Sequence, residues 1–66
     1  MRLDPLEIIK TAREYGLRPH GLKAEAFTLF KQGYTAGEAY LLMKRRATLG
    51  TLHSYHVEWI NAKIAD

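Results

Sequence analysis

The 66-residue sequence contains no cysteine and only two prolines, and it has no long run of apolar residues. Without cysteine no disulfide holds the fold together, so a chain of this length depends on well-packed helices, an oligomer or a bound partner. Without a long apolar run, it has neither a membrane-spanning segment nor the apolar centre of a secretory signal. We therefore expect a single domain over residues 1–66, located in the cytoplasm and making no contact with a membrane.

A strong excess of one charge is also missing. Ten Lys and Arg residues oppose seven Asp and Glu residues, which gives a formal net charge of +3. A surplus this small permits an acidic partner such as a nucleic acid, but it does not require one. The charge balance therefore excludes neither a DNA-binding protein nor a protein-binding one.

The residue patterns of catalysis and metal binding are sparse as well. The sequence has no glycine-rich phosphate loop, no paired carboxylates beside an apolar pocket, and no nucleophile with an adjacent base. His53 and His56 are spaced to share a metal ion, but no cysteine, carboxylate or third histidine lies at ligand spacing near them. We expect no enzyme activity, no metal site and no cofactor.

Four segments of the sequence have the apolar spacing of helices, and no segment has the alternation of a strand. The first segment begins at Pro5 after a capping Asp4, and Gly16 is placed to end it. The helices are expected at about residues 5–15, 22–32, 36–46 and 49–64. The predicted fold is therefore all-α, a small bundle of four helices containing a helix-turn-helix.

The third and fourth segments have clear start signals and are separated by a short break. Thr35 and Glu38 have the spacing of a capping box, and Thr48 is placed to cap the fourth segment. The third segment ends in the basic run 44–46, whose charges suit the negative end of a helix dipole. Two helices joined by a tight break, the second starting with polar residues beside basic ones, form the layout that inserts a helix into a major groove.

The fourth segment carries two apolar stripes that lie roughly 120° or more apart around the helix. One stripe consists of Leu52, Tyr55, Trp59 and Ala62, and the other of Val57, Ile60 and Ile64. One stripe can face the core, whereas the other needs either the first helix folded back over it or the same helix of a second copy. We favour the second arrangement and predict a homodimer.

Residues 27–39, FTLFKQGYTAGEA, resemble the helix-turn-helix of LuxR-type response regulators and of sigma-factor region 4. Those families show an apolar helix followed by Gly-x-Ser/Thr-x-x-Glu-Ile-Ala. The resemblance resumes at residues 48–55, TLGTLHSY, which are similar to the start of the families' recognition helix. It covers about residues 22–60. It implies a sequence-specific DNA-binding protein, a small transcriptional regulator that inserts the start of its fourth helix into the major groove of double-stranded DNA.

The resemblance also implies which residues contact DNA. The residues placed near base edges are Thr51, His53 and Ser54, with His56 as a further candidate for the same surface. The residues placed near phosphates are Lys44, Arg45 and Arg46, together with the helix start at Thr48, whose amides suit an anion. The basic run has an equally good interpretation as a solvated helix end.

The competing hypothesis is a small helical adaptor that binds RNA polymerase or another regulator through the outer stripe of the fourth helix and makes no contact with DNA. RNA binding by the same basic surface is a third hypothesis, and it lacks an evident pair of exposed aromatic residues for stacking on unpaired bases. The salt dependence of binding distinguishes the DNA-binding hypothesis from the adaptor hypothesis. Binding through phosphates weakens by orders of magnitude between low and moderate salt, whereas an apolar interface barely responds.

Overall fold

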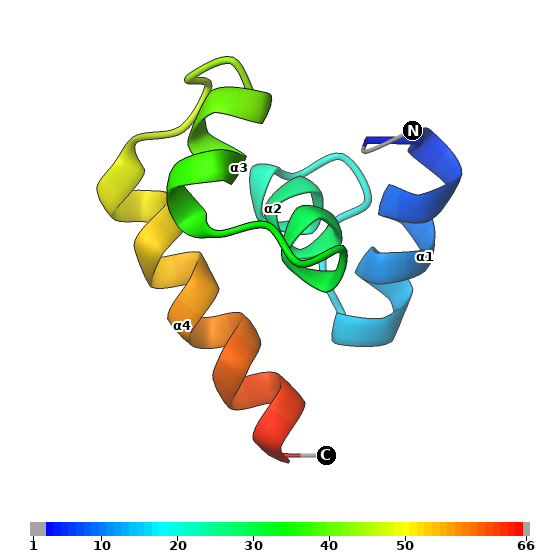
Figure 1. Cartoon of the computed structure of the whole chain (residues 1–66). Helices are drawn as coiled ribbons and strands as arrows, with labels where there is room; N and C mark the ends of the chain where they lie inside the picture. Colours follow the sequence, from blue (N-terminus) through cyan, green and yellow to red (C-terminus); the bar gives the residue numbers. More distant parts are fainter. Residues whose placement is uncertain (1–2, 66) are drawn as a thin grey trace.

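The first helix begins and ends where its sequence signals lie. In the computed structural model, which describes residues 3–65, α1 spans Pro5–Tyr15 (Figure 1). The carboxylate of Asp4 accepts a hydrogen bond from the amide of Leu6 at 2.9 Å and so caps the helix. Gly16 follows the last turn with a φ of +66°, the left-handed conformation that ends many helices.

Three further helices complete the described chain. Helix α2 spans Leu22–Lys31, α3 spans Ala36–Leu42 and α4 spans Leu49–Ala65. No residue between 3 and 65 belongs to a strand, so the predicted all-α fold is confirmed. Helix α2 ends one residue before its predicted end, and α4 continues one residue beyond its own. None of these four helices combines the length and the apolar character needed to cross a lipid bilayer.

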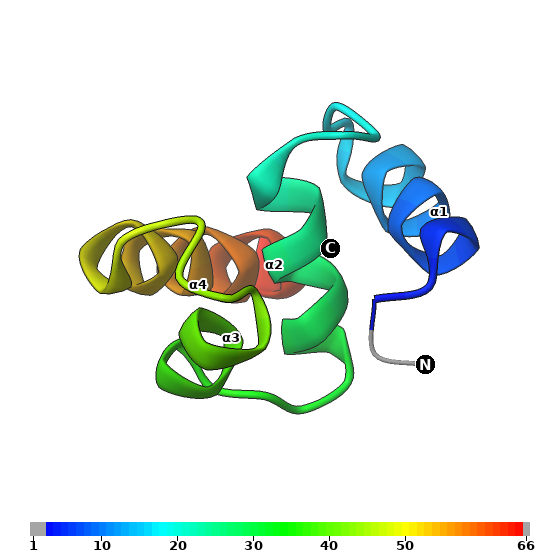
Figure 2. The ribbon, with the colours of Figure 1, turned by 90° about the horizontal axis from the view of Figure 1, so that it is seen from above.

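Helix α2 lies at the centre of the molecule. It contacts α1 on one side and α3 and α4 on the other, so that α1 and α4 flank it (Figures 1 and 2). Accordingly, most of α2 is inaccessible to solvent: its buried residues are Ala24, Ala26, Phe27, Thr28, Leu29 and Phe30. The hydroxyl of Thr28 is satisfied because it donates to the carbonyl of Ala24 at 2.7 Å.

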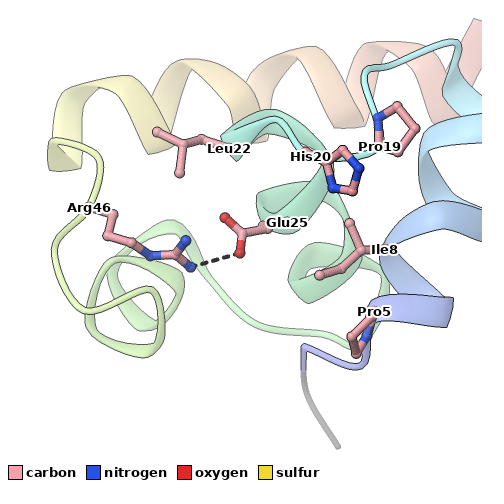
Figure 3. A pocket seen from close by; sticks show the side chains of 7 residues that line it. All are labelled: Pro5, Ile8, Pro19, His20, Leu22, Glu25 and Arg46. Carbon is pink, nitrogen blue, oxygen red and sulfur yellow. Dashed lines mark hydrogen bonds and ion pairs between the residues drawn. The ribbon is translucent and has the colours of Figure 1, made fainter.

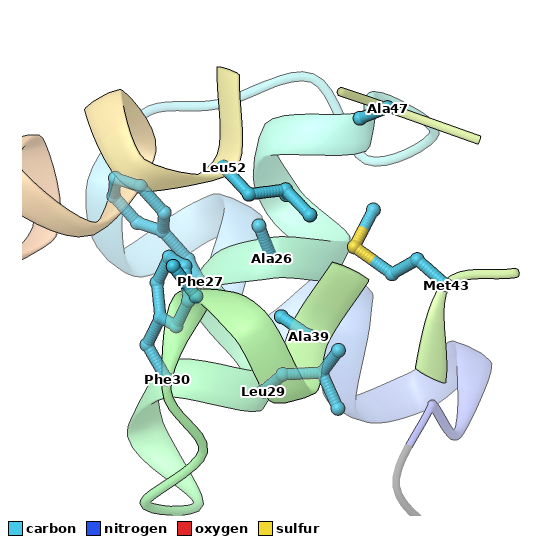
Figure 4. Close-up of a cluster of buried hydrophobic side chains, with 9 residues drawn as sticks. Ala26, Phe27, Leu29, Phe30, Ala39, Met43, Ala47 and Leu52 are labelled. Carbon is cyan, nitrogen blue, oxygen red and sulfur yellow. The ribbon is translucent and has the colours of Figure 1, made fainter. Parts of the chain in front are cut away.

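The hydrophobic core joins α2, α3 and α4 (Figure 4). Its buried residues are Ala26, Phe27, Leu29, Phe30, Ala36, Ala39, Met43, Ala47 and Leu52. Met43 and Ala47 belong to the connection between α3 and α4, while Leu52 lies in the first turns of α4. The connection is therefore anchored in the core at both ends, which fixes how α4 leaves α3.

The prediction that α3 continues to residue 46 is wrong, because the helix ends four residues earlier. The amide of Lys44 donates to the carbonyl of Leu41, and the amide of Arg45 donates to the carbonyl of Tyr40, both at 3.0 Å. These two bonds are those of a Schellman motif, which satisfies the last carbonyls of a helix and turns the chain away. Lysine and arginine favour a helix locally, but burial of Met43 directly after α3 favours the earlier end.

Candidate nucleic-acid interface

The turn between α3 and α4 has a backbone that is unusual for its side chains. Lys44 and Arg45 have φ angles of +55° and +60°, and the amide of Arg46 donates to the carbonyl of Met43 at 3.2 Å. Two consecutive positive φ angles define a mirror-image turn in which glycine, asparagine and aspartate predominate. A side chain in this conformation costs roughly 1–2 kcal/mol. The turn therefore holds two basic residues where smaller residues would be less strained.

The same two residues are open to solvent. Lys44 and Arg45 are exposed, and within residues 3–65 neither forms an ion pair. The guanidinium of Arg45 lies 6.0 Å from the centre of the Tyr40 ring, a cation–π contact with the last turn of α3. This contact orients Arg45 without neutralising it, so the turn presents two positive charges beside the start of α4.

Arg46, the third residue of the predicted basic run, is held by α2 instead. Its Nη2 lies 2.7 Å from Oε1 of Glu25, and its Nε donates to the carbonyl of Met43 at 3.0 Å (Figure 3). The pair borders a hollow of about 260 Å³ whose other lining residues are Pro5, Ile8, Pro19, His20 and Leu22. Arg46 thus ties the turn to α2, and its charge is already paired.

Thr48 caps the start of α4, as predicted. Its Oγ1 accepts a hydrogen bond from the amide of Thr51 at 3.1 Å, and its hydroxyl donates to Oγ1 of Thr51 at 2.8 Å. The first bond is an N-cap, which satisfies one of the unpaired amides at the helix start. The hydroxyl groups of Thr48 and Thr51 are thus hydrogen-bonded to each other, and Thr51 is half-buried. The base contact predicted for Thr51 would therefore require this local pair to open.

His53 and Ser54 lie on the outer side of α4. Both are exposed, and neither side chain forms a hydrogen bond within the described part of the chain. The neighbouring Leu52 is buried in the core, because it lies on the opposite side of the helix. Their unoccupied hydrogen-bonding groups face solvent, as contact with a base edge requires.

His56 differs from His53 and Ser54 because its ring packs against other side chains of the chain. Its ring is edge-on to Phe30, with the ring centres 4.7 Å apart, and it lies 5.8 Å from the ring of Trp59. It is half-buried, and its contact with Phe30 places it against α2. The structure therefore does not bring His56 to the predicted DNA surface.

The remaining charges near α4 are largely paired. Lys23 of α2 lies 3.1 Å from Glu58, and Lys31 lies 3.1 Å from Glu14. The first pair counters the negative charge of Glu58, which would otherwise repel a phosphate approaching α4. No three His, Asp or Glu side chains gather as metal ligands do anywhere between residues 3 and 65. The unpaired cations on the connection into α4 are therefore those of Lys44 and Arg45.

Two supporting residues were not found from the sequence. Tyr40 contacts Arg45 across five positions, a distance that the Schellman motif sets and that a continuous helix would not. Glu25 is 21 positions from Arg46, and no local pattern relates them. Comparison of the chain with protein-family models, with curated proteins and with solved structures found no match.

Proposed function

We propose that this chain is a sequence-specific DNA-binding protein, a small transcriptional regulator that inserts the start of α4 into the major groove. The observation that supports this best is the strained turn: Lys44 and Arg45 occupy left-handed positions and are exposed, unpaired and adjacent to the start of α4. Strained residues persist where a function requires their side chains. Two solvent-facing charges at that point suit the phosphates that flank a groove.

The candidate residues have separate roles in this function. Lys44 and Arg45 contact phosphates and supply affinity, while His53 and Ser54 offer an imidazole and a hydroxyl to base edges and supply specificity. Thr48 fixes the start of α4 through its cap on Thr51. In this arrangement, Arg46 and His56 position the turn and the helix through Glu25 and Phe30 and do not contact DNA.

We propose that the chain acts as a homodimer, because two copies present two α4 helices to one duplex and a pair of half-sites gives higher specificity. Its proposed location is the cytoplasm. The proposed role is binding without catalysis. RNA polymerase or another regulator is a further proposed partner.

A second function is favoured by a different observation. The C-terminal half of α4 exposes three aliphatic side chains, those of Val57, Ile60 and Ile64. Contiguous exposed apolar residues mark interaction surfaces in small soluble domains. A helical adaptor that binds a transcription or regulatory protein through this surface, without contacting DNA, is therefore the alternative.

Salt-dependent binding to a random duplex tests the proposal. Fluorescence anisotropy at low and moderate salt should show affinity falling steeply with salt. The double variant Lys44→Gln/Arg45→Gln should reduce the slope of log K against log salt by about two, because each lost phosphate contact removes roughly 0.9.

The matched control is Lys10→Gln/Arg13→Gln, which removes the same charge from α1 on the far side of α2 (Figure 2). It should leave the slope unchanged. An affinity that does not respond to salt, or equal losses in the two double variants, would contradict DNA binding through the turn.

A further inference from the structure

The hollow beside Glu25 and Arg46 lies where four parts of the chain meet. Its lining comes from α1, from the connection between α1 and α2, from the start of α2 and from the turn after α3 (Figure 3). Its volume of about 260 Å³ is slightly below the ~300–1,000 Å³ of pockets that hold drug-sized ligands. A molecule smaller than a drug therefore suits it.

One side of the hollow is charged and the rest is largely apolar. The carboxylate of Glu25 and the guanidinium of Arg46 form the charged side, with the Glu25 side chain only 15% exposed. Figure 3 shows Glu25 between Arg46 and Ile8. The apolar lining residues are Pro5, Ile8, Pro19 and Leu22. A sheltered carboxylate is stable only beside groups that donate hydrogen bonds to it, so the charged side is a place of strong polar contacts.

The ion pair leaves hydrogen-bonding groups unused on both residues. A guanidinium has five N–H donors, distributed over three nitrogens. Arg46 donates from Nε to the carbonyl of Met43 and from Nη2 to Oε1 of Glu25. Within residues 3–65, Nη1 of Arg46 and Oε2 of Glu25 form no hydrogen bond. Both residues line the hollow, so a molecule held there finds a cationic donor and an anionic acceptor side by side.

These adjacent opposite charges restrict the chemistry of the occupant. Phosphate or another simple anion is attracted by Arg46 and repelled by Glu25, and a simple cation meets the reverse. A molecule that carries both charges on neighbouring atoms satisfies both residues. The carboxylate of an α-amino acid can accept from Nη1 of Arg46 while its ammonium group donates to Oε2 of Glu25. We infer that the hollow binds a free α-amino acid whose aliphatic side chain lies on the apolar lining.

A bound amino acid would contact α1, α2 and the turn together. The folded chain alone brings these parts side by side, so the ligand binds the folded state and its stability should rise with ligand concentration. The site lies apart from Lys44 and Arg45, which do not line the hollow. The inference therefore does not rest on the proposed DNA binding.

Nuclear magnetic resonance titration of the wild type with L-leucine tests the site. Saturable shifts should appear at the amides of Ile8, His20, Leu22 and Glu25, with a dissociation constant of about 1 mM or lower. Three analogues each lack one part: 4-methylpentanoate has no ammonium group, 3-methylbutylamine no carboxylate and glycine no side chain. Each should bind at least about tenfold more weakly, because it leaves a polar group unpaired or the apolar lining uncovered.

Two results of this titration would overturn the inference. The first is the absence of saturable shifts at these amides up to about 10 mM leucine. The second is equal affinity for leucine and for 4-methylpentanoate, which would show that the carboxylate of Glu25 does not recognise the ammonium group.

Glu25→Gln tests the recognition of the ammonium group from the protein side. The amide oxygen of glutamine can still accept from Arg46, but the negative charge is lost. Leucine affinity should fall by at least about tenfold, and the preference for leucine over 4-methylpentanoate should disappear. A preference that survives in this variant would contradict the inference. The analogue series on the wild type decides the same question if Glu25→Gln does not fold.

The matched control is Glu14→Gln. It breaks the ion pair between Glu14 and Lys31, which also joins another part of the chain to α2 but does not border this hollow. It should bind leucine like the wild type, and circular dichroism checks that both variants remain helical. An equal loss of leucine affinity in Glu14→Gln and Glu25→Gln would overturn the inference, because the loss would then not depend on the hollow.

Duplex titration of the same wild-type sample separates this inference from the proposed function. Leucine binding in a chain that does not bind DNA would support the site in the hollow and remove the proposed function. DNA binding in a chain that does not bind leucine would overturn this inference alone.

Discussion

Three helices of this protein end with a residue in the left-handed conformation, and the third differs in kind from the others. Gly16 and Gly33 follow α1 and α2 with φ angles of +66° and +97°, whereas Lys44 follows α3 with a φ of +55°. Glycine adopts this conformation without steric penalty, and lysine does not. The backbone alone therefore favours glycine at residue 44, and the reason for lysine must lie in its side chain, which faces solvent.

Lys44→Gly should accordingly separate stability from binding. Relief of roughly 1–2 kcal/mol of backbone strain, less about 0.5–1 kcal/mol for the greater freedom of glycine in the unfolded chain, should raise the free energy of unfolding by about 0.5–1 kcal/mol. Under the proposed function, affinity for DNA should fall. Urea denaturation followed by circular dichroism measures the first effect, and anisotropy the second. A variant that is less stable than the wild type would show that Lys44 supports the fold.

At the scale of elements, α3 and α4 begin alike. Each starts with a capping threonine followed two residues later by an exposed glycine: Thr35 and Gly37 in α3, Thr48 and Gly50 in α4. A Cβ at Gly50 would meet nothing within 4 Å, and a Cβ at Gly37 would meet only Oγ1 of Thr35 at 3.9 Å. Packing within the chain therefore requires glycine at neither position.

Gly50→Ala and Gly37→Ala form a matched pair for this reason. Both should raise the free energy of unfolding by up to about 0.5–1 kcal/mol, because alanine loses less conformational freedom than glycine when a helix forms. The melting temperature should rise slightly as a result. If the start of α4 lies in a groove, only Gly50→Ala adds a methyl group where DNA approaches, so only this variant should weaken binding. Equal affinities for the two variants would argue against close approach of DNA at Gly50.

Helix starts were predictable from the sequence, and one helix end was not. Asp4, Thr35 and Thr48 cap the helices that their spacing indicated, because a cap depends on residues within three positions. The end of α3 depends on burial of Met43, which local propensity does not contain. The half-burial of His56 was not predictable for a similar reason: it depends on the packing of α4 against Phe30.

At the scale of the whole molecule, α2 connects every other part. Within residues 3–65, three ion pairs join it to its surroundings: Lys31 to Glu14 of α1, Lys23 to Glu58 of α4, and Glu25 to Arg46 of the turn. Exposed pairs of this kind contribute about 0–1 kcal/mol each, so they orient the parts more than they stabilise them. None was predictable, because each joins residues at least 17 positions apart.

The stability of the molecule therefore depends on the single core. Leu52→Ala should lower the free energy of unfolding by about 2–5 kcal/mol, because it opens a cavity beside Met43 and Ala26. The free energy of unfolding of a domain of this size rarely exceeds about 3–5 kcal/mol. Circular dichroism at room temperature should therefore show that the variant is largely unfolded. Leu41→Ala, at an exposed leucine, is the control and should remain folded. A well-folded Leu52→Ala would show that the core reaches beyond the residues that surround this side chain.

Trp59 is the sole tryptophan of the chain, and its indole packs between the ring of Phe30 and the ammonium group of Lys63, with its N–H buried. It therefore lies on the inner side of α4, opposite the surfaces proposed for DNA and for a regulatory protein. Its emission should shift to longer wavelength when α4 leaves α2 and stay almost constant when a partner binds outside. The molecule thus carries an intrinsic optical reporter that distinguishes unfolding from association without any added dye.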